Sequence, residues 1–82
     1  MAAAHNGLGY CALRVNDLKE AEKQFSTALK ANSEDASNLV GLGIAYQRQG
    51  KNAEAAKYFA EALKIQPDNA EGKELLAKVS GR

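Results

Sequence analysis

Apolar residues recur at helical spacing in two neighbouring stretches of the chain, 36–49 and 52–65. In each stretch they fall three or four residues apart, which places them on one face of a helix. The first set is Leu39, Leu42, Gly43 and Tyr46, and the second is Ala55, Phe59, Ala62 and Leu63. Gly50 lies between the stretches and tolerates the left-handed conformation that ends a helix, Asn52 is expected to cap the second helix, and Pro67 is expected to stop it. The pattern predicts a helical hairpin.

The same pattern occurs 34 residues earlier in the chain. The residues identical at this offset include Leu8, Gly9, Arg14, Glu20, Ala21, Lys23, Phe25, Ala28, Leu29 and Lys30. A fixed period of this size is typical of proteins built from repeated helical units. The sequence therefore predicts antiparallel helices over 2–15, 18–31, 36–49, 52–65 and 70–80, with no strand.

The spacing of these residues resembles the tetratricopeptide repeat. Its Leu-Gly, Ala-x-x-x-Phe and Pro positions are filled at Leu42-Gly43, Ala55–Phe59 and Pro67. The first repeat departs from the family pattern, with His5 at the usual Trp position, Ala12 at the Tyr position, Asn16 at the turn Gly and Ser33 at Pro. The resemblance implies an all-α superhelix forming one domain over 1–82, with repeat one at 2–35, repeat two at 36–69 and a capping helix at 70–80.

The two end helices are expected to differ in how their apolar faces are covered. Leu75, Leu76 and Val79 can cover the apolar edge that the fourth helix leaves, as in a capped solenoid. The first helix has no obvious capping residue, and its apolar face is expected to carry Ala4, Leu8, Ala12 and Val15. We therefore expect the chain to come from a longer array, or to fray or self-associate at this N-terminal edge.

Composition narrows the function classes further. The net charge is +1, and the basic residues form no cluster of the kind that binds nucleic acid. The chain has a single cysteine, which can form neither an intrachain disulfide nor a zinc cluster. No apolar run reaches the length of a membrane span. His5 and Cys11 are interpreted as packing residues, Cys11 as a small buried one. We expect no enzyme activity, catalytic residue, metal or cofactor; the sequence leaves the cellular location open.

Family resemblance implies that the first helix of each repeat lines an inner groove that binds partner segments. The residues of the inner register that we expect to bind a partner are Asn6, Tyr10, Leu13, Val40, Ile44, Gln47 and Arg48. Alternatively, Val40 and Ile44 pack across the repeat boundary against the helices at 2–15 and 70–80. One subclass binds the terminal carboxylates of chaperones with basic and amide side chains. The corresponding registers here include Gly41 and Glu71, and Glu71 would repel a carboxylate.

Three kinds of function follow as alternatives. The leading one is a protein-interaction scaffold that binds a peptide or helix in the groove. The second is an assembly element that stacks on further repeats or on another copy of the chain. The third is an RNA-binding repeat, which Tyr10, Arg14 and Arg48 are too few to support.

Overall fold

Five α-helices follow one another along the chain in the computed structural model, which describes the backbone of residues 2–80 and the side chains from Gly7 to Ser80. They are α1 (Ala2–Arg14), α2 (Leu18–Ala31), α3 (Ala36–Arg48), α4 (Asn52–Ile65) and α5 (Ala70–Val79). No strand occurs in residues 2–80. The all-α prediction is confirmed, and α1, α3 and α5 each end one residue earlier than predicted.

Side chains just before three of the helices satisfy backbone N–H groups of the first turn. An oxygen of Asp17 accepts a hydrogen bond from the N–H of Glu20 at 3.3 Å, and Asn69 accepts one from Gly72 at 2.7 Å. Asp35 does the same for α3. Such N-caps stabilise a helix by about 1 kcal/mol each. They explain why these helices begin where they do.

Turns within the two hairpins use one left-handed residue each. Asn16 has φ 62° and Gly50 has φ 84°, so Asn16 takes the conformation of the glycine that it replaces. The prediction that Asn52 caps α4 is wrong. Asn52 is the first helical residue, and the preceding Lys51 makes no side-chain capping bond.

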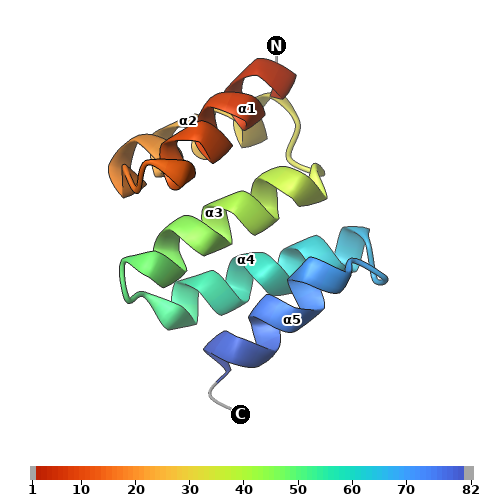
Figure 1. Ribbon diagram of the computed structural model, residues 1–82. Coiled ribbons are helices and arrows are strands. Elements are labelled where there is room, and N and C mark those ends of the chain that lie inside the picture. Colours follow the sequence, from red (N-terminus) through yellow and green to blue (C-terminus); the bar gives the residue numbers. More distant parts are fainter. Residues whose placement is uncertain (1, 81–82) are drawn as a thin grey trace.

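The helices form two hairpins and a final single helix (Figure 1). α1 packs against α2 and α3 against α4, while α2 contacts α3 and α4 contacts α5 across the hairpin boundaries. The first helices also contact each other in succession, α1 with α3 and α3 with α5. The chain therefore grows along one direction, with α1 and α5 at its two ends (Figure 1).

Phe25 and Phe59 are the largest fully buried side chains. A Cβ atom built on Gly9 would lie 2.8 Å from the Phe25 ring, and one on Gly43 would lie 2.5 Å from the Phe59 ring. A Cβ on Gly41 would overlap the Phe25 ring as well. The glycines thus let a ring lie directly against a helix backbone, which confirms the packing role inferred for Gly9 and Gly43.

The apolar face expected on α1 is only partly buried. Leu8 is 52% exposed and Val15 is 75% exposed, whereas Ala12 and Leu13 belong to the core. Cys11, predicted to be a small buried residue, is exposed. Ala4 and His5 lie outside the residues whose side chains are described. Helix α1 therefore turns its Gly9–Ala12–Leu13 side inward and leaves the neighbouring side open.

Leu75, Leu76 and Val79 of α5 are half-buried and pack against the core cluster around Phe59. This confirms the prediction that the last helix covers the apolar edge of α4.

Tyr46 links the two hairpins. Its hydroxyl donates a hydrogen bond to a carboxylate oxygen of Glu22 at 3.1 Å, and its ring stacks on Tyr58 with a centroid distance of 5.5 Å. Gln49 donates a second bond to Glu22. Burial raises the pKa of Tyr46 to about 12, and the hydrogen bond and negative charge of Glu22 act in the same direction. The protonated phenol is thus favoured in the folded state.

We expect stability to fall as the pH rises through the interval between about 10 and 12. The unfolded chain loses the Tyr46 proton first, so it binds fewer protons than the folded chain there, and alkali favours unfolding. Chemical denaturation at stepped pH measures this loss. Tyr46→Phe has no proton to lose and should show a flatter alkaline limb. An equally steep limb in this variant would contradict the assignment.

Candidate functional site

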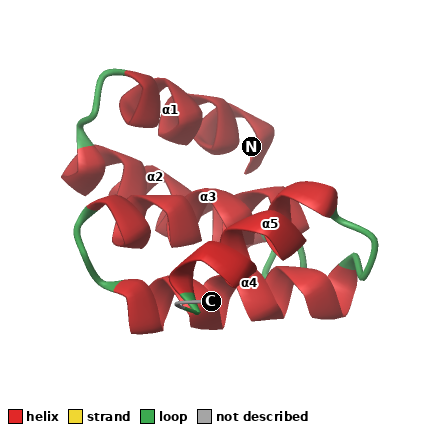
Figure 2. Cartoon of the chain, turned by 60° about the horizontal axis from the view of Figure 1, so that its bottom comes forward, coloured by secondary structure: helices red, strands yellow, loops and turns green. Residues whose placement is uncertain are grey.

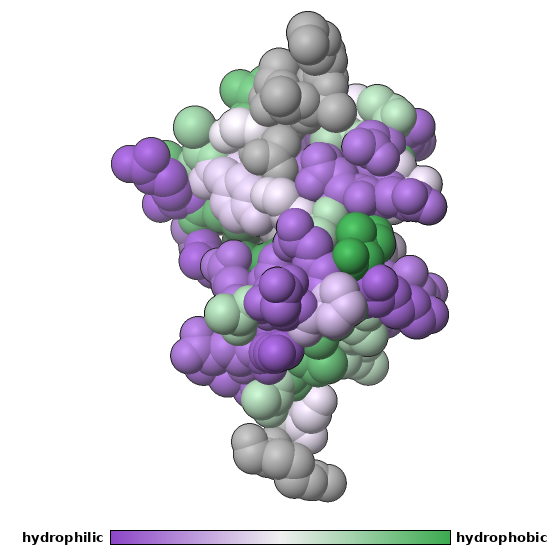
Figure 3. Space-filling view, turned by 90° about the vertical axis from the view of Figure 1, so that its right-hand side faces the viewer, coloured by the Kyte–Doolittle hydropathy of each residue, from purple (hydrophilic) through white to green (hydrophobic). Residues whose placement is uncertain are grey.

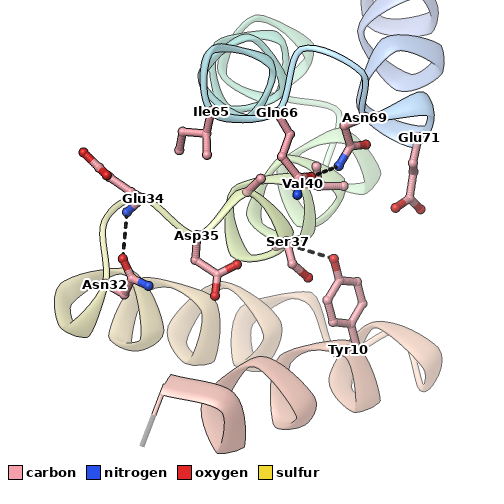
Figure 4. A pocket seen from close by; sticks show the side chains of 11 residues that line it. Tyr10, Asn32, Glu34, Asp35, Ser37, Val40, Ile65, Gln66, Asn69 and Glu71 are labelled. Carbon is pink, nitrogen blue, oxygen red and sulfur yellow. Dashed lines mark hydrogen bonds between the residues drawn. The ribbon is translucent and has the colours of Figure 1, made fainter.

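A cavity of about 330 Å³ opens between the two loops that connect successive hairpins (Figure 4). The loops, residues 32–35 and 66–69, lie on the same side of the molecule, and Tyr10 from α1 closes one end. The lining residues are Tyr10, Asn32, Glu34, Asp35, Ala36, Ser37, Val40, Ile65, Gln66, Asn69 and Glu71. We call this cavity the loop pocket.

Tyr10 is held in place at the edge of the loop pocket. Its hydroxyl donates a hydrogen bond to the backbone carbonyl of Ser37 at 2.8 Å. Its ring meets Phe25 edge-on, with a centroid distance of 4.9 Å and an interplanar angle of 81°. Burial raises the pKa of Tyr10, the Ser37 bond opposes that rise, and the charges of Glu71 and Asp35 add to it. The hydrogen bond and the ring contact therefore fix the Tyr10 phenol at the edge of the loop pocket, near the carboxylates of Glu71 and Asp35.

Hydrogen bonds also fix both loops. Asn69 donates to the side-chain oxygen of Gln66 at 2.9 Å while its own oxygen caps α5. In the other loop, the backbone N–H of Glu34 donates to Asn32 at 3.1 Å (Figure 4). The loop pocket is consequently preformed by local bonds within each loop.

The charged lining of the loop pocket is entirely acidic. Glu34, Asp35 and Glu71 contribute carboxylates, and none of the lining residues with described side chains is Lys, Arg or His. Glu34 and Glu71 are exposed, whereas Asp35 is half-buried and caps α3. Seen from the side of the two loops, hydrophilic side chains cover most of the face, with hydrophobic patches between them (Figure 3). This lining attracts cations and hydrogen-bond donors and repels carboxylates.

The low exposure of some predicted groove residues changes the role assigned to them. Leu13 is 4% exposed and belongs to the core, so its prediction as a groove contact is wrong. Val40 is 1% exposed and also belongs to the core, where it forms part of the floor of the loop pocket. Leu13 packs in the core cluster around Phe25, and Val40 packs in the core cluster around Phe59. Tyr10 is the predicted residue that stays accessible in the loop pocket.

The remaining predicted residues lie outside the loop pocket. Ile44 is half-buried and packs against both core clusters, and Gln47 is half-buried. Arg48 donates a hydrogen bond to the backbone carbonyl of Leu13 at 2.8 Å, so it joins the two hairpins. The side chain of Asn6 lies outside the described residues.

Sequence reasoning missed most of the polar lining. It placed the site on the first helices alone, whereas Glu34, Gln66 and Asn69 come from the loops. A signal was present, because Asn32 and Asp35 lie 34 residues before Gln66 and Asn69. Residues one period apart recur at the same edge of a repeat array. The repeat therefore brings both loops to one side.

The described residues give no support for a metal site or for a membrane-spanning helix. Among them, no group of three or more His, Cys, Asp or Glu side chains is arranged to hold a metal ion. None of the helices described is long and apolar enough to cross a membrane.

Known proteins resemble this chain in sequence and in fold. A family model described as "Tetratricopeptide repeat" matches residues 1–36, 9–70 and 40–79. Cellulose synthase operon protein C of Komagataeibacter xylinus is 44% identical over 63 residues, which are 77% of this chain and 5% of that protein. A probable UDP-N-acetylglucosamine–peptide N-acetylglucosaminyltransferase SPINDLY of Solanum lycopersicum is 36% identical over 73 residues, 89% of this chain and 8% of that protein.

Structural comparison gives the same fold. The crystal structure of MamA protein superposes with a TM-score of 0.82 at 21% identity, covering 98% of this chain and 49% of that one. The chain thus spans less than a tenth of the length of the two curated relatives named above, and about half of MamA.

Proposed function

The chain belongs to the tetratricopeptide repeat family, whose repeats generally mediate protein–protein interaction, and from this premise we propose that its loop pocket binds a basic segment of a partner protein. The observation that carries the proposal is the lining of the pocket, in which every charged side chain is a carboxylate. A lysine or arginine side chain is the group that such a lining favours. The proposed role is that of a binding module and not of an enzyme.

The shape of the loop pocket also supports a basic segment as the ligand. Glu34 and Glu71 lie on opposite sides of the pocket, and Ile65 and the ring of Tyr10 add apolar surface to its lining (Figure 4). A long basic side chain can lay its methylene stem on apolar surface and keep its charged end near carboxylates. The fixed loops mean that little ordering is needed when the partner binds, which favours affinity.

Neutralising one carboxylate tests the proposal. Glu71→Gln should weaken binding of a lysine-bearing segment by roughly two- to fivefold, the range expected for an exposed ion pair. Glu74→Gln is the matched control, because Glu74 lies on the same helix, is also exposed and does not line the pocket. The probes are short unstructured peptides that differ only in a central Lys or Glu. Amide chemical shifts report both the affinity and the place of binding.

The expected result is that the Lys peptide shifts the amides of Tyr10, Ser37 and Glu71, and that added salt weakens the effect. The Glu peptide should leave these amides unchanged. Equal responses to the two peptides, or equal losses in the Glu71 and Glu74 variants, would overturn the proposal.

A further inference from the structure

Helices α1, α3 and α5 run in the same direction. Each begins on the side of the loops 32–35 and 66–69 and ends toward the side of the hairpin turns (Figure 1, Figure 2). Helix α3 contacts both of the others. A residue that follows a pocket residue by two or three full turns of the same helix therefore lies on the same face, farther from the loops.

Three side chains continue the surface of the loop pocket in this way. Ser37 and Glu71 line the pocket. Ile44 and Arg48 follow Ser37 by seven and eleven residues, and Lys78 follows Glu71 by seven, which is about two or three turns in each case. Ile44 is half-buried, whereas Arg48 and Lys78 are exposed. We call the surface formed by Ile44, Arg48 and Lys78 the inner strip.

The charge changes sign between the loop pocket and the inner strip. The charged residues of the pocket are carboxylates, whereas those of the strip are the cations Arg48 and Lys78. The sequences of α1 and α3 contain no Asp, Glu or Lys, and each has one Arg, at its last residue. The helix dipoles act in the opposite sense, with about half a charge at each helix end, and reduce this difference without reversing it. A partner lying along α3 thus meets negative charge at one end and positive charge at the other.

Arg48 is held in position on the inner strip. Its Nη1 donates a hydrogen bond to the backbone carbonyl of Leu13 at 2.8 Å, and the side chain stays exposed. This bond uses one of the five N–H donors of the guanidinium group. A guanidinium that is already fixed loses little freedom when it binds a carboxylate, with which it can form two parallel hydrogen bonds.

We propose that the inner strip binds an acidic side chain of the same partner segment whose basic side chain occupies the loop pocket. Ser37 and Arg48 are separated by about 16 Å of helix, at about 1.5 Å per residue. An extended chain rises about 3.3 Å per residue, so the two charged side chains of the partner lie about five residues apart. Ile44 lies between the two charged ends and offers apolar surface to the middle of the segment.

The partner segment is therefore extended and oppositely charged at its two ends, and not uniformly basic. This inference rests on the proposed function, because the loop pocket holds one end of the segment. It adds the second end, the spacing and the contribution of Lys78.

Peptides that differ at one position test the inference. Each is short, unstructured and capped at both ends, and carries Lys followed five residues later by Glu, Gln or Lys. Because the charges do not fix the chain direction, the reversed sequences are measured as well. In one of the two directions we expect the Lys–Glu peptide to bind about two- to fivefold more tightly than the Lys–Gln peptide, as for an exposed ion pair, and the Lys–Lys peptide to bind more weakly. Amide chemical shifts give the affinities, and Glu should enlarge the shifts of Arg48 and Lys78.

Lys78→Gln should remove most of the preference for Glu over Gln and leave the affinity for the Lys–Gln peptide unchanged. Lys73→Gln is the matched control, because Lys73 is on the same helix, is also exposed, and lies about 140° around the helix from Lys78. This control should keep the full preference. Arg48 is left unchanged, since its bond to Leu13 joins the two hairpins.

Two results would overturn this inference and leave the proposed function standing: equal affinities for the Lys–Glu and Lys–Gln peptides in both directions, or an undiminished preference in the Lys78 variant. Binding that does not depend on the first Lys, or that Glu71→Gln fails to weaken, would overturn the proposed function and this inference together.

Discussion

Phe59→Ala is expected to leave most of the protein unfolded at room temperature. The ring is fully buried at the centre of the core cluster that joins α3, α4 and α5. Removing a buried phenylalanine costs about 3–5 kcal/mol. A domain of this size has a net stability of about 3–5 kcal/mol, so the loss is comparable with the whole free energy of unfolding. Denaturant unfolding followed by circular dichroism measures it.

Ile65→Ala is the control for this prediction. Ile65 lies on the same helix and is partly exposed, so its truncation should lower the denaturation midpoint only slightly. A Phe59→Ala midpoint as close to the parent's as that of Ile65→Ala would show that the ring does not support the core.

Gly41→Leu is expected to destabilise the protein by more than about 3 kcal/mol, beyond the usual range for overpacking. The reason is that even a Cβ atom at this position overlaps the Phe25 ring, which also lies against the backbone of α1 at Gly9. Any shift of the ring to make room would disturb its packing against α1. Thermal and denaturant unfolding give the change in stability.

Gly7→Leu provides the matched comparison one repeat earlier. Among the described residues nothing lies within 4 Å of its Cβ position, so this change should raise stability by up to about 1 kcal/mol through helix propensity. Two identical substitutions in equivalent registers are thus expected to have opposite signs. Equal destabilisation at both positions would mean that helix geometry, and not the ring, makes these glycines necessary.

The sequence predicted the helices well because their signals are local. Apolar spacing within each helix placed all five, and α2 and α4 have the predicted bounds. Asp17 caps α2 and Asn16 takes the left-handed conformation, as is typical of these side chains. Both features depend only on neighbouring residues in the chain. The Asn52 cap failed because α4 begins one residue earlier than such a cap requires.

Burial was harder to predict, because it depends on which neighbour covers a face. Leu8 and Leu42 have the same register and the same side chain, and only Leu42 has a helix packed on it. Leu13 and Val40 were placed in the groove on register alone, but both are buried, Leu13 in the core cluster around Phe25 and Val40 in the one around Phe59. The loop pocket was missed for the same reason. Its walls come from two loops that are brought together only when the hairpins stack.

The arrangement of contacts has a consequence for how the chain folds. Every pair of helices in contact is adjacent in the chain or separated by a single helix, and α1 never meets α5 in the described residues. No long loop must close before a contact forms, so the entropic barrier is small and folding should occur in microseconds to milliseconds. Either end can also open while the rest stays folded, as in other arrays with nearest-neighbour coupling. Hydrogen exchange should therefore be slowest in α3, which contacts each of the other four helices, and faster toward both termini.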